Sequence, residues 1–598
     1  MLRELERTQN EEANIMRRIA FVAGISALSL LAAGCGSAAT TGSSNTSSSS
    51  STSGPQKGGT VVYALPSGNS PNWFFPLISY AADSALNFTV DETSYLPLVY
   101  FNQKGQVSDY YGLATSIDAN KAGAQLTVHM NTTFKWSNGY PVTAQDVVFT
   151  YQLMRAASLS GTHYAWTFNG QGFGGMPNEW KSVKAVGQHT VVITTTKPVN
   201  QAWFEDNGIE EIIPVPKSVW DRYPGNMAQE LKWIKSIANQ PNNKAYQVVD
   251  GPFKFSSYSP NNNWTYVPNP GFGGHKPYIA KLVYQYETSD AAEFAALKQG
   301  TINVGYLPAA DVASQSELQN DTIVPQYQIS FNYLQLNQSP KAPGGIGKAF
   351  ADVKVRRALQ MGVDQKAIIK NIWHGYGVTE DTVLAPKPKI PAMDPQLISH
   401  PLYPFNPAQG KKLLESDGYH MVNGVMEKNG IKLEFTMLCA NGQASYTTID
   451  QLLQSDWARE GIKVNLKFET FNQVISNTQS NPTQWAAQQW NGGWGYATLW
   501  PSGDGLFNTG GGENVGAYSN RTMNKLIQGT ESPAPSIQAS LQRMYQYEEF
   551  AAKNLPSVIL LPDQPTLTVI AKNVHGAIKT YNPIGGWLFP NEWWISSN

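Results

Sequence analysis

One stretch constrains the fold more than any other, because a strand pattern, a helix pattern and a second strand pattern follow each other between residues 432 and 468. Lys432–Leu438 reads KLEFTML, a helix pattern extends across YTTIDQLLQSDWAREG, and IKVNLKF then places alternate apolar residues from Ile462 to Phe468 on one face. Parallel strands need a crossover of about a dozen residues or more, usually a helix. The pattern therefore predicts an α/β protein with a largely parallel sheet.

Helix-capping signals recur along the rest of the chain. Thr143, with Asp146 three residues later, forms a capping box before an apolar-faced helix. The same spacing at Asp290 and Glu293 predicts a helix that Gly300 ends. Three further N-caps are expected, at Asp352, Asp364 and Asn406. At 598 residues, the chain is long enough for more than one lobe.

The first 58 residues differ in kind from the rest. Arg17 and Arg18 precede a short apolar run, and LLAAGCGS then leads to Cys35, which resembles a bacterial lipobox. We predict a lipoprotein signal peptide over residues 1–35, with translation starting at Met16, and a Ser/Thr/Gly-rich flexible tether over residues 36–58. Diacylation of Cys35 would hold the protein on the outer face of the cell membrane. The alternative is ordinary secretory cleavage, with Cys35 as a bystander.

Composition and motifs exclude several classes of function. The 43 basic and 44 acidic residues give a net charge of −1, which does not suggest a nucleic-acid partner. Two cysteines and eight scattered histidines predict no metal site, and we expect no cofactor. No catalytic motif stands out, so we predict that the protein is not an enzyme. The acidic cluster Glu205, Glu210 and Glu211 is interpreted as a solvated helix face.

Several stretches, in chain order, resemble the extracytoplasmic solute-binding proteins of family 5, which serve peptide- and nickel-type ABC importers. LTVHMNTTFKWSNGYPVTAQDVVFTYQLM, over residues 126–154, carries the best signature, and DGPFKF, FADVKVRRALQMGVDQKAII and KNLPSVILL follow it. The resemblance implies an α/β, periplasmic-binding-protein-like fold of type II, a three-lobe Venus flytrap with mixed sheets. It places lobe I at 59–95, 211–330 and 555–598, lobe II at 96–210 and lobe III at 331–554, with hinge strands near Phe331–Asn337 and Leu555–Leu561.

The same resemblance implies a function and partners. The protein would be the lipid-anchored, extracytoplasmic substrate-binding component of an ABC importer. It would act as a monomer that delivers its ligand to a permease with ATPase subunits. Two alternatives remain open, an oligosaccharide-binding member of the same family and a secreted hydrolase that uses the same fold.

A tryptophan-rich stretch, WNGGWGYATLWP, matches the family segment that lines the cleft. That segment typically reads Trp-x-x-Asp-Tyr-x-x-Pro, and its Asp binds the α-ammonium group of a peptide. Here Ala497 replaces the Asp and Thr498 the Tyr, so we predict a neutral or apolar ligand on an aromatic wall. The predicted ligand-binding residues are Trp73, Phe74, Phe75, Asn337, Trp490, Asn491, Gly492, Gly493, Trp494, Gly495, Tyr496, Thr498 and Trp500.

Overall fold

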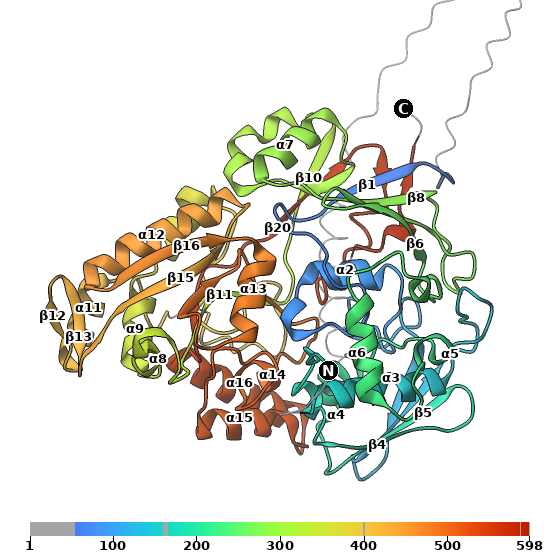
Figure 1. Ribbon diagram of the computed structural model, residues 1–598, viewed down its shortest axis with the longest axis horizontal. Coiled ribbons are helices and arrows are strands. Elements are labelled where there is room, and N and C mark those ends of the chain that lie inside the picture. Colours follow the sequence, from blue (N-terminus) through green and yellow to red (C-terminus); the bar gives the residue numbers. More distant parts are fainter. Residues whose placement is uncertain (1–53, 160–164, 399–400, 587, 597–598) are drawn as a thin grey trace, which may run out of the picture. The chain divides into compact units, whose positions relative to one another are not determined.

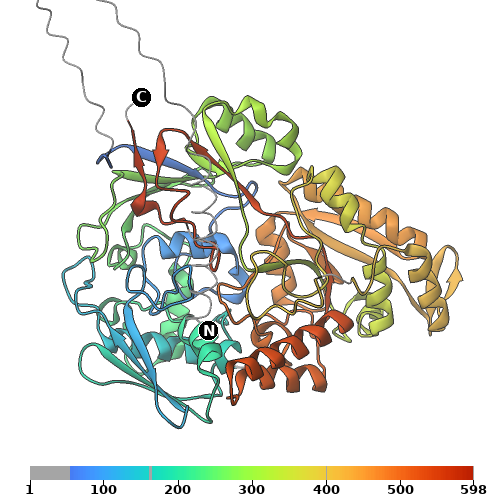
Figure 2. The same cartoon turned by 180° about the vertical axis from the view of Figure 1, so that it is seen from behind.

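Segments from the start, middle and end of the chain meet in one seven-stranded sheet of the computed structural model, where Figures 1 and 2 show blue, green and red strands side by side. The structure describes residues 54–159, 165–398, 401–586 and 588–596. Pro55–Asn598 form one unit. Cys35 and the predicted signal peptide lie outside the described residues.

The seven-stranded sheet is mixed. Its order is β10-β20-β9-β1-β8-β7-β6, and β1 is parallel to β8 and β9 while its other neighbouring pairs are antiparallel. The strands are β1 (Thr60–Ala64), β6 (Phe253–Ser259), β7 (Asn263–Pro268), β8 (Lys281–Gln285), β9 (Val304–Tyr306), β10 (Asp321–Gln326) and β20 (Thr566–Ala571).

A second sheet contains the strand-helix-strand unit that the sequence predicts. Its order is β16-β15-β17-β11-β18, and β19 also pairs with β11. The strands are β11 (Ser330–Leu336), β15 (Glu434–Ala440), β16 (Lys463–Glu469), β17 (Ala487–Gln489), β18 (Gly493–Gly495) and β19 (Val558–Leu560). Strand β15 is parallel to β16 and β17, with α12 (Ala444–Glu460) as the crossover, whereas β17, β18 and β19 are antiparallel to β11.

The other sheets are antiparallel. A four-stranded sheet has the order β2-β3-β5-β4, from β2 (Ala114–Ala119), β3 (Gln125–Met130), β4 (Trp180–Ala185) and β5 (Thr190–Thr195). Two small sheets consist of β12 (His420–Val422), β13 (Val425–Lys428) and β14 (Ile431–Lys432), and of β21 (Val574–His575) and β22 (Trp594–Ile595). The predicted α/β class with mixed sheets is confirmed. The expectation of a largely parallel sheet is wrong, because the crossover at α12 is not repeated between most neighbouring strands.

Most predicted caps are confirmed. Helix α3 (Ala144–Ala157) begins with the Thr143–Asp146 capping box. Helix α7 (Asp290–Gln299) is the exception, because Ser289, not Asp290, accepts the capping hydrogen bond, although Gly300 does end the helix at φ 68°. Side chains of Asp352, Asp364 and Asn406 cap α9 (Val353–Met361), α10 (Gln365–Ala367) and α11 (Pro407–Ser416).

The remaining helices pack around these sheets. They are α2 (Ala85–Glu92), α4 (Gln201–Phe204), α5 (Lys217–Trp220), α6 (Met227–Ile237), α8 (Ile346–Phe350), α13 (Phe471–Ser480), α14 (Asp504–Phe507), α15 (Arg521–Glu531) and α16 (Ile537–Asn554). The largest buried apolar cluster runs from Val61 on β1 to Trp593, so it joins both ends of the described chain. Among the described residues, none of the helices has the length and apolar character needed to cross a membrane.

Candidate functional site

The main cavity of the described structure lies beside the seven-stranded sheet and has a volume of about 90 Å³. Tyr63 on β1, Phe253 on β6 and Tyr284 on β8 form its sheet side, and the end of α2 borders it. Loop residues between 97 and 111, Glu210, Ala497 and residues between 582 and 590 complete the described lining. Distant segments of the chain therefore form one binding-sized space.

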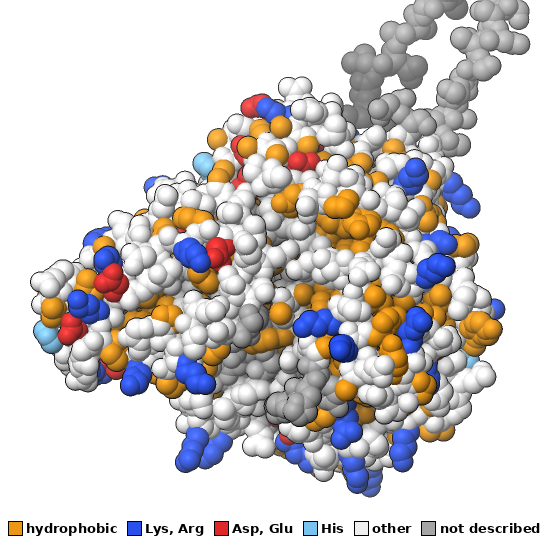
Figure 3. Space-filling model, viewed as in Figure 1, with side chains coloured by type: hydrophobic (Ala, Val, Ile, Leu, Met, Phe, Trp, Pro, Cys, Tyr) orange, Lys and Arg blue, Asp and Glu red, His pale blue; other side chains and the backbone are white. Residues whose placement is uncertain are grey.

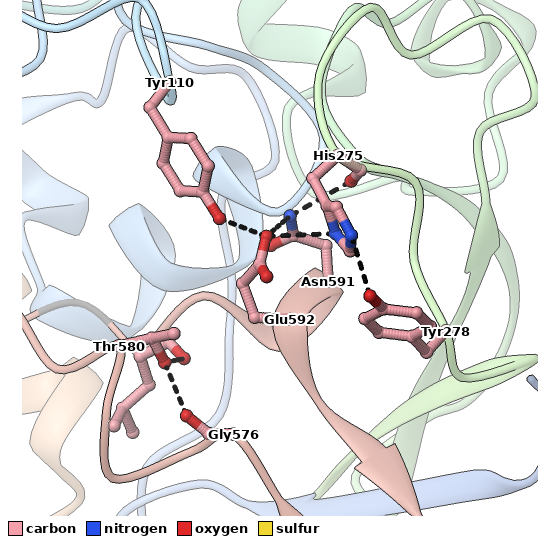
Figure 4. A network of polar contacts seen from close by, with 8 residues as sticks. Tyr110, His275, Tyr278, Gly576, Thr580, Asn591 and Glu592 are labelled. Atoms are coloured by element: carbon pink, nitrogen blue, oxygen red, sulfur yellow. Dashed lines mark hydrogen bonds and ion pairs between the residues drawn. The ribbon is translucent and has the colours of Figure 1, made fainter. Parts of the chain in front are cut away.

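A polar network fixes the C-terminal part of this lining (Figure 4). The carboxylate of Glu592 accepts a hydrogen bond from the hydroxyl of Tyr110, and its Oε1 lies 3.1 Å from Nδ1 of His275. Nδ2 of Asn591 donates to the backbone oxygen of His275 at 3.2 Å, and Nε2 of His275 lies 3.0 Å from the hydroxyl of Tyr278. The chain that follows the cavity-lining residue Pro590 is thus held by two other segments.

The cavity carries two acidic side chains, Glu92 at the end of α2 and Glu210. Its described lining includes no lysine, arginine or histidine. Burial raises the pKa of both carboxyl groups well above the ordinary value, and Glu210 adds to the shift at Glu92 through charge repulsion. Glu205 and Glu211 are also only partly exposed, so the interpretation of this cluster as a solvated helix face is wrong.

The tryptophan-rich stretch forms a layer of ring contacts. Strand β18 pairs with β11 so that Trp494 lies opposite Phe331. The Trp494 ring stacks on Phe173, with 5.8 Å between the ring centroids and 8° between the planes. The Trp490 ring packs edge-on against Tyr333 at 4.8 Å. Both tryptophans remain partly exposed.

The rest of this stretch is more buried. The hydroxyl of Tyr496 donates to the backbone oxygen of Val383 at 2.6 Å. Thr498 Oγ1 accepts from the backbone N–H of Trp500 at 2.9 Å, and the exposed fractions of these two residues are only 2% and 7%. The glycines leave backbone accessible, since Gly493 and Gly495 are exposed while Gly492 and Asn491 are partly exposed.

The other predicted binding residues pack inside the protein. Trp73 donates from Nε1 to the Leu77 oxygen at 3.1 Å, and its ring meets that of Trp166 edge-on. Phe74 and Phe75 are buried. Asn337 is fully buried and donates from Nδ2 to the backbone oxygens of Pro482 and Trp485, at 2.8 and 2.9 Å.

None of the thirteen predicted binding residues lines the main cavity as described, but Ala497, inside the same stretch, does. Their role as ligand contacts stays a prediction. Sequence reasoning missed the cavity residues Glu92, Tyr111 and Tyr284, for which no local motif exists. For Glu210 a signal was present, the unpaired acidic cluster, but its surroundings were not predictable.

Asp504 joins the tryptophan-rich region to residues near 170–207. Its Oδ2 accepts hydrogen bonds from the backbone N–H of Gly174 at 2.9 Å and from Nε1 of Trp203 at 3.0 Å. Asn207 Nδ2 donates to the backbone oxygen of Trp500 at 2.9 Å. Burial raises the pKa of Asp504 to about 6. These contacts close one side of the protein across segments about 300 residues apart in sequence.

Mixed α/β sheets around an enclosed cavity are the architecture of a periplasmic-type binding protein. The model of the bacterial extracellular solute-binding proteins, family 5 (middle region), matches residues 110–513. The chain belongs to this family, whose members are the solute-binding proteins of ABC transporters. The family consists of extracytoplasmic binding proteins and not of enzymes.

Individual relatives agree with this assignment. The chain is 24% identical to the oligopeptide-binding protein AppA of Bacillus subtilis over 553 residues, which covers 91% of this chain and 92% of AppA. It is 23% identical to the dipeptide-binding protein of Escherichia coli, over 89% of this chain and 94% of that protein. The solved structure of Bacillus subtilis AppA with a nonapeptide superposes with a TM-score of 0.76 at 22% identity, covering 91% of this chain and 100% of AppA. Together with the lactococcal OppA structure, which has a TM-score of 0.75 at 19% identity and covers 90% of this chain and 100% of OppA, it confirms the predicted fold.

Proposed function

We propose that this protein captures a peptide or a similar solute in its main cavity and delivers it to the permease of an ABC importer. The observation that supports this most is the cavity itself, which is closed by sheet residues, the 97–111 loop, Ala497 and the C-terminal segment. A site built from such distant segments can open when they separate, and a ligand that contacts all of them favours the closed form. We propose the three predicted lobes as the moving parts, with β11 and β19 as the hinge.

Identification of the compounds that co-purify with the protein tests this function. The protein is purified under native conditions and denatured, and the released compounds are analysed by mass spectrometry. Peptides are the expected result. A single oligosaccharide would support the alternative specificity, and a stable compound recovered unchanged would count against a hydrolase.

The aromatic wall is tested with the released compound as the titrant. Trp494→Ala and Trp500→Ala are expected to weaken its binding about tenfold or more, because a buried aromatic contact contributes about 1–3 kcal/mol. Tyr140→Ala is the control, since Tyr140 is 67% exposed and does not line the cavity. Unchanged affinity in both tryptophan variants would assign the wall a packing role only.

We also propose that Cys35 is diacylated and anchors the protein to the outer face of the cell membrane. Metabolic labelling with a fatty acid is expected to mark the wild-type protein and not Cys35→Ser. Equal labelling of both would contradict the anchor.

A further inference from the structure

The acidic side chains of the main cavity have no counter-charge. Neither Glu92 nor Glu210 has a side-chain hydrogen bond or an ion pair with any described residue, and the described lining contains no basic group. The groups behind them are acidic as well, Asp91 beside Glu92, and Asp206 and Glu211 beside Glu210. Burial of a carboxylate is costly unless a cation or hydrogen-bond donors accompany it. The cavity therefore lacks one component that its chemistry requires.

A tyrosine hydroxyl in the same cavity also lacks a partner. Tyr111 is 7% exposed and lines the cavity, and its hydroxyl has no hydrogen-bond partner among the described residues. The other lining tyrosines are satisfied, because Tyr63 accepts from Tyr306, Tyr100 accepts from Asn582, and Tyr284 pairs with Thr93. A buried hydroxyl without a partner points to a group that the ligand supplies.

Aromatic faces surround these polar atoms. The Tyr111 ring lies 4.0 Å from that of Phe589 between centroids, and the Tyr63 and Tyr284 rings are 5.5 Å apart. Aromatic faces attract organic cations and repel anions, because the ring quadrupole is negative above the plane. Carboxylates together with aromatic rings are thus suited to an alkylammonium or guanidinium group.

We infer that the cavity binds a positively charged organic group, held by Glu92 and Glu210 with Tyr111 as an additional hydrogen-bonding partner. This inference rests on the proposed function and replaces its neutral ligand with a cationic one. Ala497 lines the same cavity, so the charge lost at that position is supplied by side chains on other elements.

Binding of a cation has a consequence for protons. Burial and mutual repulsion favour the protonated form of both glutamates in the empty cavity, since their pKa values are raised. A bound cation favours the carboxylates, so each binding event releases protons, and affinity rises with pH until the raised pKa values are passed. The acidic neighbours Asp91, Asp206 and Glu211 act in the same direction.

Thermal-shift and calorimetric titrations of the purified protein test the inference with three probes. These are spermidine, trialanine amide with one ammonium group, and N-acetyl-trialanine amide with none. We expect at least one of the two cationic probes to bind and the acetylated peptide to bind about 10- to 100-fold more weakly than trialanine amide, because a charge-assisted contact is lost. Calorimetry in buffers of different ionisation enthalpy should show proton release.

Two isosteric variants assign the effect to the cavity. Glu92→Gln and Glu210→Gln are expected to reduce cation binding at least about tenfold and to abolish proton release, while thermal stability without ligand stays equal or rises. Glu415→Gln is the matched control, because Glu415 is exposed on α11 and does not line the cavity.

The outcomes separate this inference from the proposed function. Equal binding of the charged and acetylated peptides would overturn the inference and leave peptide binding intact. Binding of spermidine alone would support the inference and contradict a peptide ligand. Stabilisation by none of the probes at about 10 mM would overturn the inference, whatever mass spectrometry finds.

Discussion

At the scale of single residues, the protein buries many carboxyl groups without basic partners. Figure 3 shows basic side chains spread over one face with few acidic ones among them, although the sequence has nearly equal numbers of both. Glu460 at the end of α12 is an example away from the cavity. It is 0% exposed, both its oxygens lack hydrogen-bond partners among the described residues, and burial raises its pKa to about 9.

We predict that Glu460→Gln stabilises the protein at about pH 8 and has little effect at about pH 4. The folded pKa exceeds the unfolded one, so the glutamate costs nothing while both states are protonated. As pH rises, the cost grows by about 1.4 kcal/mol per pH unit up to the folded pKa. An increase of about 2–4 kcal/mol in the free energy of unfolding is expected at pH 8, measured by urea denaturation. Glu415→Gln is again the control, and an equal effect at both pH values would contradict this account.

Residue-level prediction from sequence succeeded where the signal was local. Thr143 and Asp146 lie three residues apart, so their capping box was readable, whereas Glu210 needed its neighbours to be known. Those neighbours come from other segments: Glu92 lies more than a hundred residues upstream and Ala497 almost three hundred downstream. Burial of a polar group is set by such distant contacts, and that is why the acidic cluster was misinterpreted.

At the scale of elements, β18 depends on a glycine that permits close approach. A Cβ atom on Gly493 would lie 1.9 Å from the backbone oxygen of Phe331 and 2.6 Å from the Cα of Asn332, both on the partner strand β11. Backbone atoms cannot move aside as a flexible side chain can. The adjacent Gly492 has no atom within 4 Å of such a Cβ.

Gly493→Ala is expected to destabilise the protein by about 3 kcal/mol, because β18 must separate from β11 to accommodate the methyl group. The stacking of Trp494 on Phe173 should weaken with it, and tryptophan fluorescence would report the change. Gly492→Ala should alter stability by less than about 0.5 kcal/mol. Similar melting temperatures for the two variants would rule out the close approach as the cause.

Elements whose partners are near in sequence were the easiest to predict. The unit of β15, α12 and β16 was found from periodicity alone, with its parallel pairing. The seven-stranded sheet was not, because β20 joins β9 and β10 from more than 200 residues away and no period in the sequence encodes that pairing. Only the family resemblance implied that the start, middle and end of the chain meet.

At the scale of the whole molecule, buried carboxyl groups set the pH at which the protein is most stable. Burial raises the pKa to about 8 at Asp206, Glu211, Glu293, Glu531 and Glu548. Each of these groups contributes stability that is present below its unfolded pKa and is lost as pH rises through the folded value. Asp417 acts oppositely, since Lys354 and Lys428 lower its pKa to about 2.

The melting temperature is therefore expected to be higher at about pH 5 than at about pH 8, and to fall again below about pH 4. Differential scanning calorimetry across this range checks the prediction. A melting temperature that rises from pH 5 to pH 8 would show that the buried carboxyl groups find cations or water in solution.

The discontinuous seven-stranded sheet also determines when the protein can fold. Strand β10 pairs only with β20, whose residues 566–571 are among the last to be synthesised. Until they emerge, β10 has no partner in this sheet and the edge of β9 facing it stays open, and open edges are sites of wrong pairing and aggregation. A chain released before residue 566 cannot complete the sheet that carries Tyr63 and Tyr284. Folding of this protein is thus a late event, completed only after nearly the whole chain is available.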